Sequence, residues 1–252
     1  MHKKRIIARL DIKNDSVIKG IHLEGLRKVG HPNEMAFKYY LQGVDEIVFM
    51  DAVAAYYDRN SLSHIIEQSC KNIFVPITVG GGLRNLEDIQ SALNSGADKV
   101  AINTKAIAKP DFITDASSVF GTQCIVVSIV AKQIAENEWE AYMDNGREPT
   151  GINAVEWACE VQKLGAGEIL LTSLDREGTR KGFHQELFHR VRDVVSIPII
   201  GCGGAGSTNN IVETLQSVDI DGVAVASILH YGITTVDALK KDIYSSGIPV
   251  RV

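Results

Sequence analysis

The sequence predicts a single (β/α)8 barrel, and three observations support that prediction. Eight short apolar runs recur along the 252 residues, segments with helical spacing separate them, and motifs of the first half return in the second half. Eight β-then-α units in about 250 residues are typical of a closed barrel. An open doubly wound sheet is the alternative.

The eight runs are expected to be parallel strands because they are apolar throughout, as in strands buried on both faces. They cover Arg5–Asp11, Asp45–Asp51, Phe74–Val79, Lys99–Asn103, Cys124–Val130, Glu168–Thr172, Pro198–Gly201 and Gly222–Ala226. Helical spacing is found in Glu34–Leu41, Leu62–Cys70, Leu86–Leu93, Ala154–Leu164, Ile211–Leu215 and Val236–Ile243. The stretch Ile12–Pro32 is expected to be a long functional loop.

An internal repeat indicates two half-barrels, of about residues 1–120 and 121–252. Val75-Pro-Ile-Thr-Val-Gly-Gly-Gly82 reappears as Ile197-Pro-Ile-Ile-Gly-Cys-Gly-Gly204, an offset of 122. Asp98-Lys-Val-Ala-Ile-Asn103 returns at an offset of 123. These offsets favour a duplication of four βα units with pseudo-twofold symmetry. Because no Pro- or Ser-rich linker separates the halves, we expect one domain.

Composition excludes several classes of partner. The net charge is -5 without a dense basic run, so neither DNA nor RNA is expected to bind. No apolar run approaches the roughly 20 residues of a membrane span, which favours a cytoplasmic protein. The four cysteines lack CxxC spacing, so we expect reduced thiols, with no metal site and no cofactor.

Residues at the carboxyl ends of the predicted strands are the candidates for a functional site. Glycines there let backbone N–H groups approach an anion, although they also serve simple tight turns. Their repetition beside polar partners predicts two phosphate cradles on opposite sides of one mouth, suited to a ligand with a phosphate at each end. The residues concerned are Gly80, Gly81, Gly82, Asn103, Thr104, Gly203, Gly204, Ala226 and Ser227.

Asp11 ends the first strand between the two cradles, which suits general acid/base chemistry, although it could instead cap the following loop. Lys19 in that loop could reach the ligand. Internal symmetry, at an offset of 119, places Val130 opposite Asp11, and valine cannot move a proton. The run Asp175-Arg-Glu-Gly-Thr179 is expected to place Gly178 beside the cradle of the seventh strand.

Four charged residues, two of each sign, begin strands at the opposite end of the barrel. They are either solvated strand ends or a fully paired network that closes the narrow end, because burial without pairing would be costly. They are Arg5, Glu46, Lys99 and Glu168.

Taken together, these residues resemble the HisF family, the cyclase subunits of imidazole glycerol phosphate synthase. The likeness runs over essentially the whole chain, through Lys4–Ala8 with Asp11, Val79–Gly82, Gly96–Val100, Ile102–Thr104, Gly165–Ser173, Asp175–Thr179 and Gly203–Gly206. The resemblance implies a half-barrel-duplicated (β/α)8 fold. It also implies conversion of a bisphosphorylated ribulosyl carboxamide to imidazole glycerol phosphate and aminoimidazole carboxamide ribotide in histidine biosynthesis.

The resemblance further implies a HisH-type glutaminase that docks at the barrel bottom as a heterodimer and delivers ammonia through the barrel. Asp11 matches one of the family's two catalytic aspartates, and the four charged residues match its ammonia gate. Asp98 and Gln123 match its surface for the glutaminase. The expected substrate- and phosphate-binding residues are Lys19, Gly82, Asn103, Thr104, Thr172, Glu177, Gly178, Gly203, Gly204, Ala226 and Ser227.

Two departures from the family pattern bear on activity. Val130 stands at the second catalytic aspartate, and Glu177 at a usual Asp. Losing a positioned acid or base commonly costs about 10²–10⁴-fold in rate. One alternative is therefore a HisF-like subunit that only conducts ammonia to a sugar amidotransferase of surface-polysaccharide biosynthesis. Another alternative is a phosphosugar isomerase similar to HisA, but the presence of all four residues of the ammonia gate argues against it.

Overall fold

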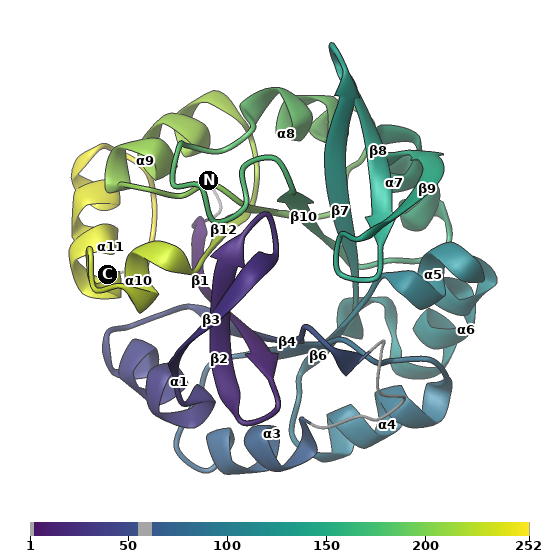
Figure 1. Cartoon of the computed structure of the whole chain (residues 1–252), viewed down its shortest axis with the longest axis horizontal. Coiled ribbons are helices and arrows are strands. Elements are labelled where there is room, and N and C mark those ends of the chain that lie inside the picture. The colour runs from purple at the N-terminus through teal and green to yellow at the C-terminus, as the bar shows by residue number, and fades with distance from the viewer. Residues whose placement is uncertain (1–2, 55–61, 252) are drawn as a thin grey trace.

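The computed structural model describes residues 3–54 and 62–251, and within them eight parallel strands close into a barrel (Figure 1). In order around the barrel they are β1 (Arg5–Lys13), β4 (Glu46–Asp51), β5 (Ile77–Gly80), β6 (Lys99–Ile102), β7 (Ile125–Ala135), β10 (Glu168–Ser173), β11 (Ile199–Cys202) and β12 (Gly222–Val225). β12 pairs with β1 and completes the closure. The predicted (β/α)8 barrel is confirmed, and each predicted strand overlaps an observed one.

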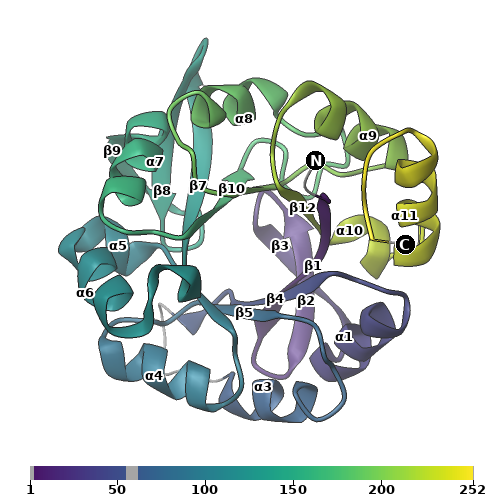
Figure 2. The same ribbon diagram turned by 180° about the vertical axis from the view of Figure 1, so that it is seen from behind.

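Helices cover the outside of the barrel, as the view from behind also shows (Figure 2). All six segments with helical spacing are helical. The helices are α1 (Pro32–Leu41), α3 (Ser63–Ser69), α4 (Leu86–Asn94), α5 (Thr104–Ala108), α6 (Asp111–Phe120), α7 (Ala154–Lys163), α8 (Gln185–Arg192), α9 (Thr208–Ser217), α10 (Ser227–His230) and α11 (Val236–Ser245), with a 3-10 turn at Thr122–Cys124. Among the described residues, none of these helices is long and apolar enough to cross a bilayer.

The expectation of a long loop over Ile12–Pro32 is wrong, because most of this stretch forms a β-hairpin. β2 (Ser16–Ile21) pairs antiparallel with the end of β1, and β3 (Glu24–Gly30) pairs with β2. Asn14 makes the first turn in the left-handed region, at φ 53°. The hairpin lies across the mouth, the end of the barrel where the strands finish (Figure 1).

A second hairpin, β8 (Glu138–Met143) and β9 (Glu148–Asn153), follows β7. β1 and β7 are the first strands of the two predicted half-barrels, so each half carries a hairpin at the same place. The pairing register agrees, because Asp11 pairs with Met50 and Val130 pairs with Thr172, and 172 − 50 is again 122. The structure therefore places Val130 at the position equivalent to Asp11.

Two apolar layers fill the fold. The larger one lies between the strands and the surrounding helices, and the smaller one fills the barrel interior. The interior layer is at most 3% exposed and consists of Ile7, Val48, Ala101, Val126, Leu170, Ile200, Cys202 and Ala224. The barrel centre is thus packed with side chains, and the functional residues lie above and below this layer.

Candidate active site at the barrel mouth

The four charged residues at the bottom of the barrel form one closed network. Arg5 donates to Glu46 at 2.7 Å and to Glu168 at 2.5 Å. Lys99 donates to the other oxygens of the same two carboxylates, at 3.0 and 2.9 Å. Of the two predicted arrangements, the paired network is the observed one. Burial alone would lower the pKa of Arg5, but the charges of Glu46 and Glu168 raise it. The effect of the carboxylates is the larger one in sum, so the pKa of Arg5 lies above its ordinary value.

Above the apolar interior layer, Arg9 crosses the barrel. Its Nε donates to Asp11 Oδ1 at 2.9 Å, and its Nη1 donates to Thr172 Oγ1 at 3.0 Å. Thr172 lies on β10, three strands around the sheet from β1, so the guanidinium reaches across the interior rather than along one wall. Nη1 also lies 3.4 Å from the sulfur of Cys202. The substrate-binding role expected for Thr172 stays a prediction, and its hydroxyl already accepts from Arg9.

Asp11, expected to act as acid or base, is buried in a chain of ion pairs. Lys19 from β2 lies 3.8 Å from Asp11 Oδ2 and also forms an ion pair with Glu177. Burial alone would raise the pKa of Asp11, but the positive charges of Arg9 and Lys19 outweigh it and hold that pKa below its usual value. Asp11 is therefore a fixed carboxylate, and its proton affinity is reduced.

Val130, opposite Asp11 in the pseudo-symmetry, packs in a small apolar cluster with Leu23, Tyr142 and Leu174. Leu23 comes from the turn between β2 and β3, so the first hairpin rests partly on this cluster. The position that would hold a second carboxylate is thus desolvated on the side facing the hairpin. Val130, Leu23 and Leu174 carry no group that can accept or donate a proton, so within this cluster Tyr142 alone has an ionisable group.

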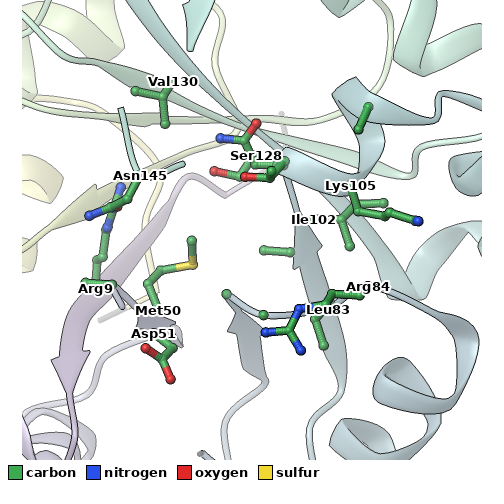
Figure 3. Close-up of a pocket in the computed structure, with 17 residues that line it drawn as sticks. Arg9, Met50, Asp51, Leu83, Arg84, Ile102, Lys105, Ser128, Val130 and Asn145 are labelled. Carbon is green, nitrogen blue, oxygen red and sulfur yellow. The ribbon is translucent and has the colours of Figure 1, made fainter. Parts of the chain in front are cut away.

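A cavity of about 330 Å³ opens at the ends of β5 and β6, and we call it the Gly82 cavity. Its lining includes the predicted residues Gly82, Asn103 and Thr104, and Gly81 at φ +93° beside Asp51. Arg9 and Arg84 lie on opposite sides of it, with Met50 next to Arg9 (Figure 3). Backbone amides, a hydroxyl and two guanidinium groups around one space can hold a phosphate group.

A second cavity, of about 850 Å³, lies between the first hairpin and the β10 loop, and we call it the Ser227 cavity. Lys19, Gly178 and Ser227 line it, together with Arg27 and Arg180. At the predicted phosphate cradle after the seventh strand, Gly204 is packed against backbone. A Cβ on Gly204 would lie 2.1 Å from the carbonyl oxygen of Gly182, so close backbone packing there requires glycine.

The remaining predicted residues occupy defined places. Gly203 packs against the carbonyl of Ser173, and the carbonyl of Ala226 accepts from His230 N at 2.9 Å. Asp98 and Gln123 are exposed, and Gln123 shares a cavity at the barrel bottom with Arg5 and Lys99. No group of three or more potential metal ligands occurs within residues 3–54 and 62–251.

Sequence reasoning missed Arg9 and a buried pair beside it. Tyr39 on α1 and His230 on α10 share a hydrogen bond of 2.8 Å between the phenol oxygen and Nδ1. Burial, with a smaller effect of Lys19, lowers the pKa of His230 to about 4, so this imidazole is neutral at pH 7.

An arginine inside an apolar strand run was a usable sequence signal for Arg9, because a buried guanidinium requires a partner. The partner of His230 lies 191 residues away, and no sequence spacing reveals it.

Comparisons with known proteins agree with this geometry. Residues 5–235 match the sequence family described as histidine biosynthesis protein. The chain is 56% identical to "Imidazole glycerol phosphate synthase subunit HisF" of Legionella pneumophila over 206 residues, which is 82% of this chain and 97% of that protein. It is 43% identical to the protein of the same name from Bacillus cereus (strain G9842) over the full length of both. The chain therefore belongs to the histidine biosynthesis protein family and, within it, to the HisF subunits of imidazole glycerol phosphate synthase.

Proposed function

We propose that this chain is the ammonia-receiving subunit of a HisF-type glutamine amidotransferase complex. The observation that carries the proposal is the closed network of Arg5, Glu46, Lys99 and Glu168 at the barrel bottom. The four charges sum to zero, so the network carries no net charge that would attract ammonium or other ions in preference to neutral ammonia. Opening one ion pair would give access to the barrel interior, and the pairs would close behind the molecule.

The ammonia would come from a HisH-type glutaminase bound over the barrel bottom. Gln123 is exposed there, in a cavity with Lys4, Arg5 and Lys99. The names of the two relatives, which are those of synthase subunits, support such a complex. Asp98 and Gln123 would contribute to the contact.

Cyclisation in histidine biosynthesis is the reaction proposed for the mouth. The family match and the two relatives support it, and the two cavities on either side of Asp11 would accept the phosphates of the ribulosyl carboxamide. In this reaction Asp11 would hold or move the proton at the ring that forms. Imidazole glycerol phosphate and aminoimidazole carboxamide ribotide would be the products.

The ion pair of Arg9 with Asp11 favours a second candidate, a subunit that conducts ammonia without cyclising a substrate. A carboxylate that accepts from a buried guanidinium at 2.9 Å is a poor proton acceptor, and Val130 offers no replacement. In that case a sugar amidotransferase of surface-polysaccharide biosynthesis would receive the ammonia. The bottom network would serve both candidates equally.

Two measurements test these assignments. Addition of the chain should stimulate a HisH-type glutaminase, and Gln123→Trp should weaken that stimulation, whereas Gln90→Trp on the exposed face of α4 should not. Absence of any stimulation would overturn the ammonia-receiving role. Loss of the ribulosyl carboxamide at saturating ammonium, followed by absorbance, then separates the candidates, because turnover supports the cyclase and no turnover supports the conduit.

A further inference from the structure

The pseudo-twofold symmetry of the barrel is broken at one pair of interior positions. Arg9 is equivalent to Ser128, because Arg9 pairs with Val48 on β4, Ser128 pairs with Leu170 on β10, and 170 − 48 is again 122. Each of the two is at most 2% exposed and stands two positions along its strand from a residue of the apolar interior layer, so both side chains point inward above that layer. One half of the chain therefore supplies a long guanidinium where the other supplies a short hydroxyl.

Arg9 fills the space above the interior layer on the side of β10 and β11. Its Nη1 donates to Thr172 Oγ1 at 3.0 Å and lies 3.4 Å from the sulfur of Cys202, which is itself a member of the layer. Its Nε donates to Asp11 at 2.9 Å. Because contacts with three side chains fix the guanidinium, this side of the interior is covered from above.

On the side of β5 and β6 the interior layer borders open space. Ala101 of the layer lines the Gly82 cavity, and so do Ser128 and Met50, which packs against the layer. Figure 3 shows Met50 and Ser128 at this cavity, with Arg9 beside Met50. None of the described residues that line the Ser227 cavity belongs to the interior layer. The interior therefore approaches the mouth next to Ala101.

A polar group lies on the same side, nearer the bottom of the barrel. Thr78 on β5 stands between Ile77 and Val79, which pack toward the helices, so its side chain points into the barrel. It is 2% exposed, and its hydroxyl has no hydrogen-bond partner among the described residues. In the strand register it pairs with Lys99 of the bottom network. Because a buried hydroxyl without a partner is costly, a small polar guest would be stabilised there.

We propose that ammonia crosses the barrel on the side of β5 and β6 and emerges in the Gly82 cavity, and that Arg9 closes the equivalent route in the other half. The inference rests on the ammonia-receiving role proposed above and adds where the ammonia leaves. The bottom network, the Thr78 hydroxyl and Ala101 are its successive steps. At the equivalent positions of the second half, Ile200 and Ala224 offer no hydrogen bond, and the guanidinium covers the exit.

Thiol accessibility gives a test that needs no partner protein. Ala101 and Ala224 are equivalent members of the interior layer, both 2% exposed, so each is replaced by cysteine in a chain whose Cys70, Cys124 and Cys159 are changed to serine. The probe is methyl methanethiosulfonate, a small neutral thiol reagent, and mass spectrometry follows each position. We expect modification of Ala101→Cys to be at least about tenfold faster than that of Ala224→Cys, because the rate depends on access to the thiol.

Arg9→Ser gives the second measurement, since it places the smaller of the two equivalent residues in both halves. In this variant we expect Ala224→Cys and the natural Cys202 to react about as fast as Ala101→Cys does. Arg190→Ser on the exposed face of α8 is the matched control and should leave all rates unchanged. If Arg9→Ser does not fold, the comparison of the two cysteines in the presence of Arg9 decides alone.

Ala101→Leu and Ala224→Leu test the passage of ammonia itself. Where the complex with the glutaminase forms product, Ala101→Leu should lower the yield from glutamine at least about fivefold relative to the yield from added ammonium, which enters from the mouth. Ala224→Leu, which adds the same volume on the other side, should leave this ratio unchanged. An equal decrease for the two variants would contradict a route on one side.

Equal modification rates of the two cysteines would overturn the inference, and so would faster modification at position 224 or none at position 101. The thiol rates do not depend on a glutaminase, whereas the ammonia-receiving role is decided by the stimulation of the glutaminase. Failure of this inference is therefore distinguishable from failure of the proposed function.

Discussion

Replacing Arg9 by methionine should destabilise the protein strongly, and the structure sets the size of the effect. Arg9 is 1% exposed, and its guanidinium is the nearest positive charge to Asp11, at 2.9 Å. Breaking a buried ion pair by removing one partner costs about 3–5 kcal/mol, because the other charge stays buried. The lost hydrogen bond to Thr172 adds about 1 kcal/mol. Lys19, at 3.8 Å from Asp11, would offset a part of this.

We therefore expect Arg9→Met to lower the free energy of unfolding by about 3–5 kcal/mol at pH 7. Urea unfolding followed by the fluorescence of Trp139 and Trp157, which are both buried, would measure it. The double variant Arg9→Met with Asp11→Leu should recover at least about half of the loss, since no charge is then left unpaired. A loss below about 1 kcal/mol for Arg9→Met, or an additive double variant, would refute the argument that the pair is tightly coupled.

Three further outcomes are expected. Glu46→Gln in the bottom network should lower the free energy of unfolding by about 1–3 kcal/mol. With the glutaminase bound, it should lower the yield of product from glutamine more than the yield from added ammonium. An equal decrease in both yields would contradict a role of the network in ammonia passage. Val130→Asp should cost about 1–3 kcal/mol by burying a neutral carboxyl group beside Leu23, and should not raise turnover of the ribulosyl carboxamide unless Arg9 is also replaced. His230 has a pKa of about 4 in the folded state against 6.5 when unfolded, so its stabilising effect is complete above pH 6.5 and is lost as the pH falls toward 4, by roughly 3 kcal/mol. A His230→Asn variant should lack this part of the pH dependence in thermal unfolding between pH 7 and 4, and an unchanged slope would refute the assignment.

The strands and helices of the barrel could be predicted because each repeats a simple pattern. Parallel strands buried on both faces are continuous apolar runs, and the duplication at an offset of 122 doubled the signal for the loops that follow β5 and β11. The four residues of the bottom network could also be identified from their charges at strand starts, but the sequence left open whether they pair or are solvated, and the structure shows that they pair. The two hairpins were not, since Gly20 and Gly25 interrupt the first and made it resemble a loop.

The ion pairs that keep Asp11 a buried carboxylate could not be predicted from its position at the end of a strand. Its neighbour Arg9 is two residues away and on the same face of β1, but only the crossing to Thr172 shows that the guanidinium stays inside the barrel. Glu177, 158 residues from Lys19, completes the arrangement by a contact that depends on how the first hairpin folds over the mouth. Side chains that meet through loops of different halves leave no periodicity in the sequence.

The two hairpins also alter how the protein meets other copies of itself. A closed barrel has no free edge, but β3 pairs only with β2 and β9 pairs only with β8 among the described strands, so each hairpin ends in an edge with unpaired backbone groups. Such edges invite pairing with another chain. β3 carries Arg27 and Lys28 along its edge, and β9 carries Glu148 and Pro149. Charge on one edge and a missing N–H on the other keep these projections from joining neighbouring molecules into larger sheets.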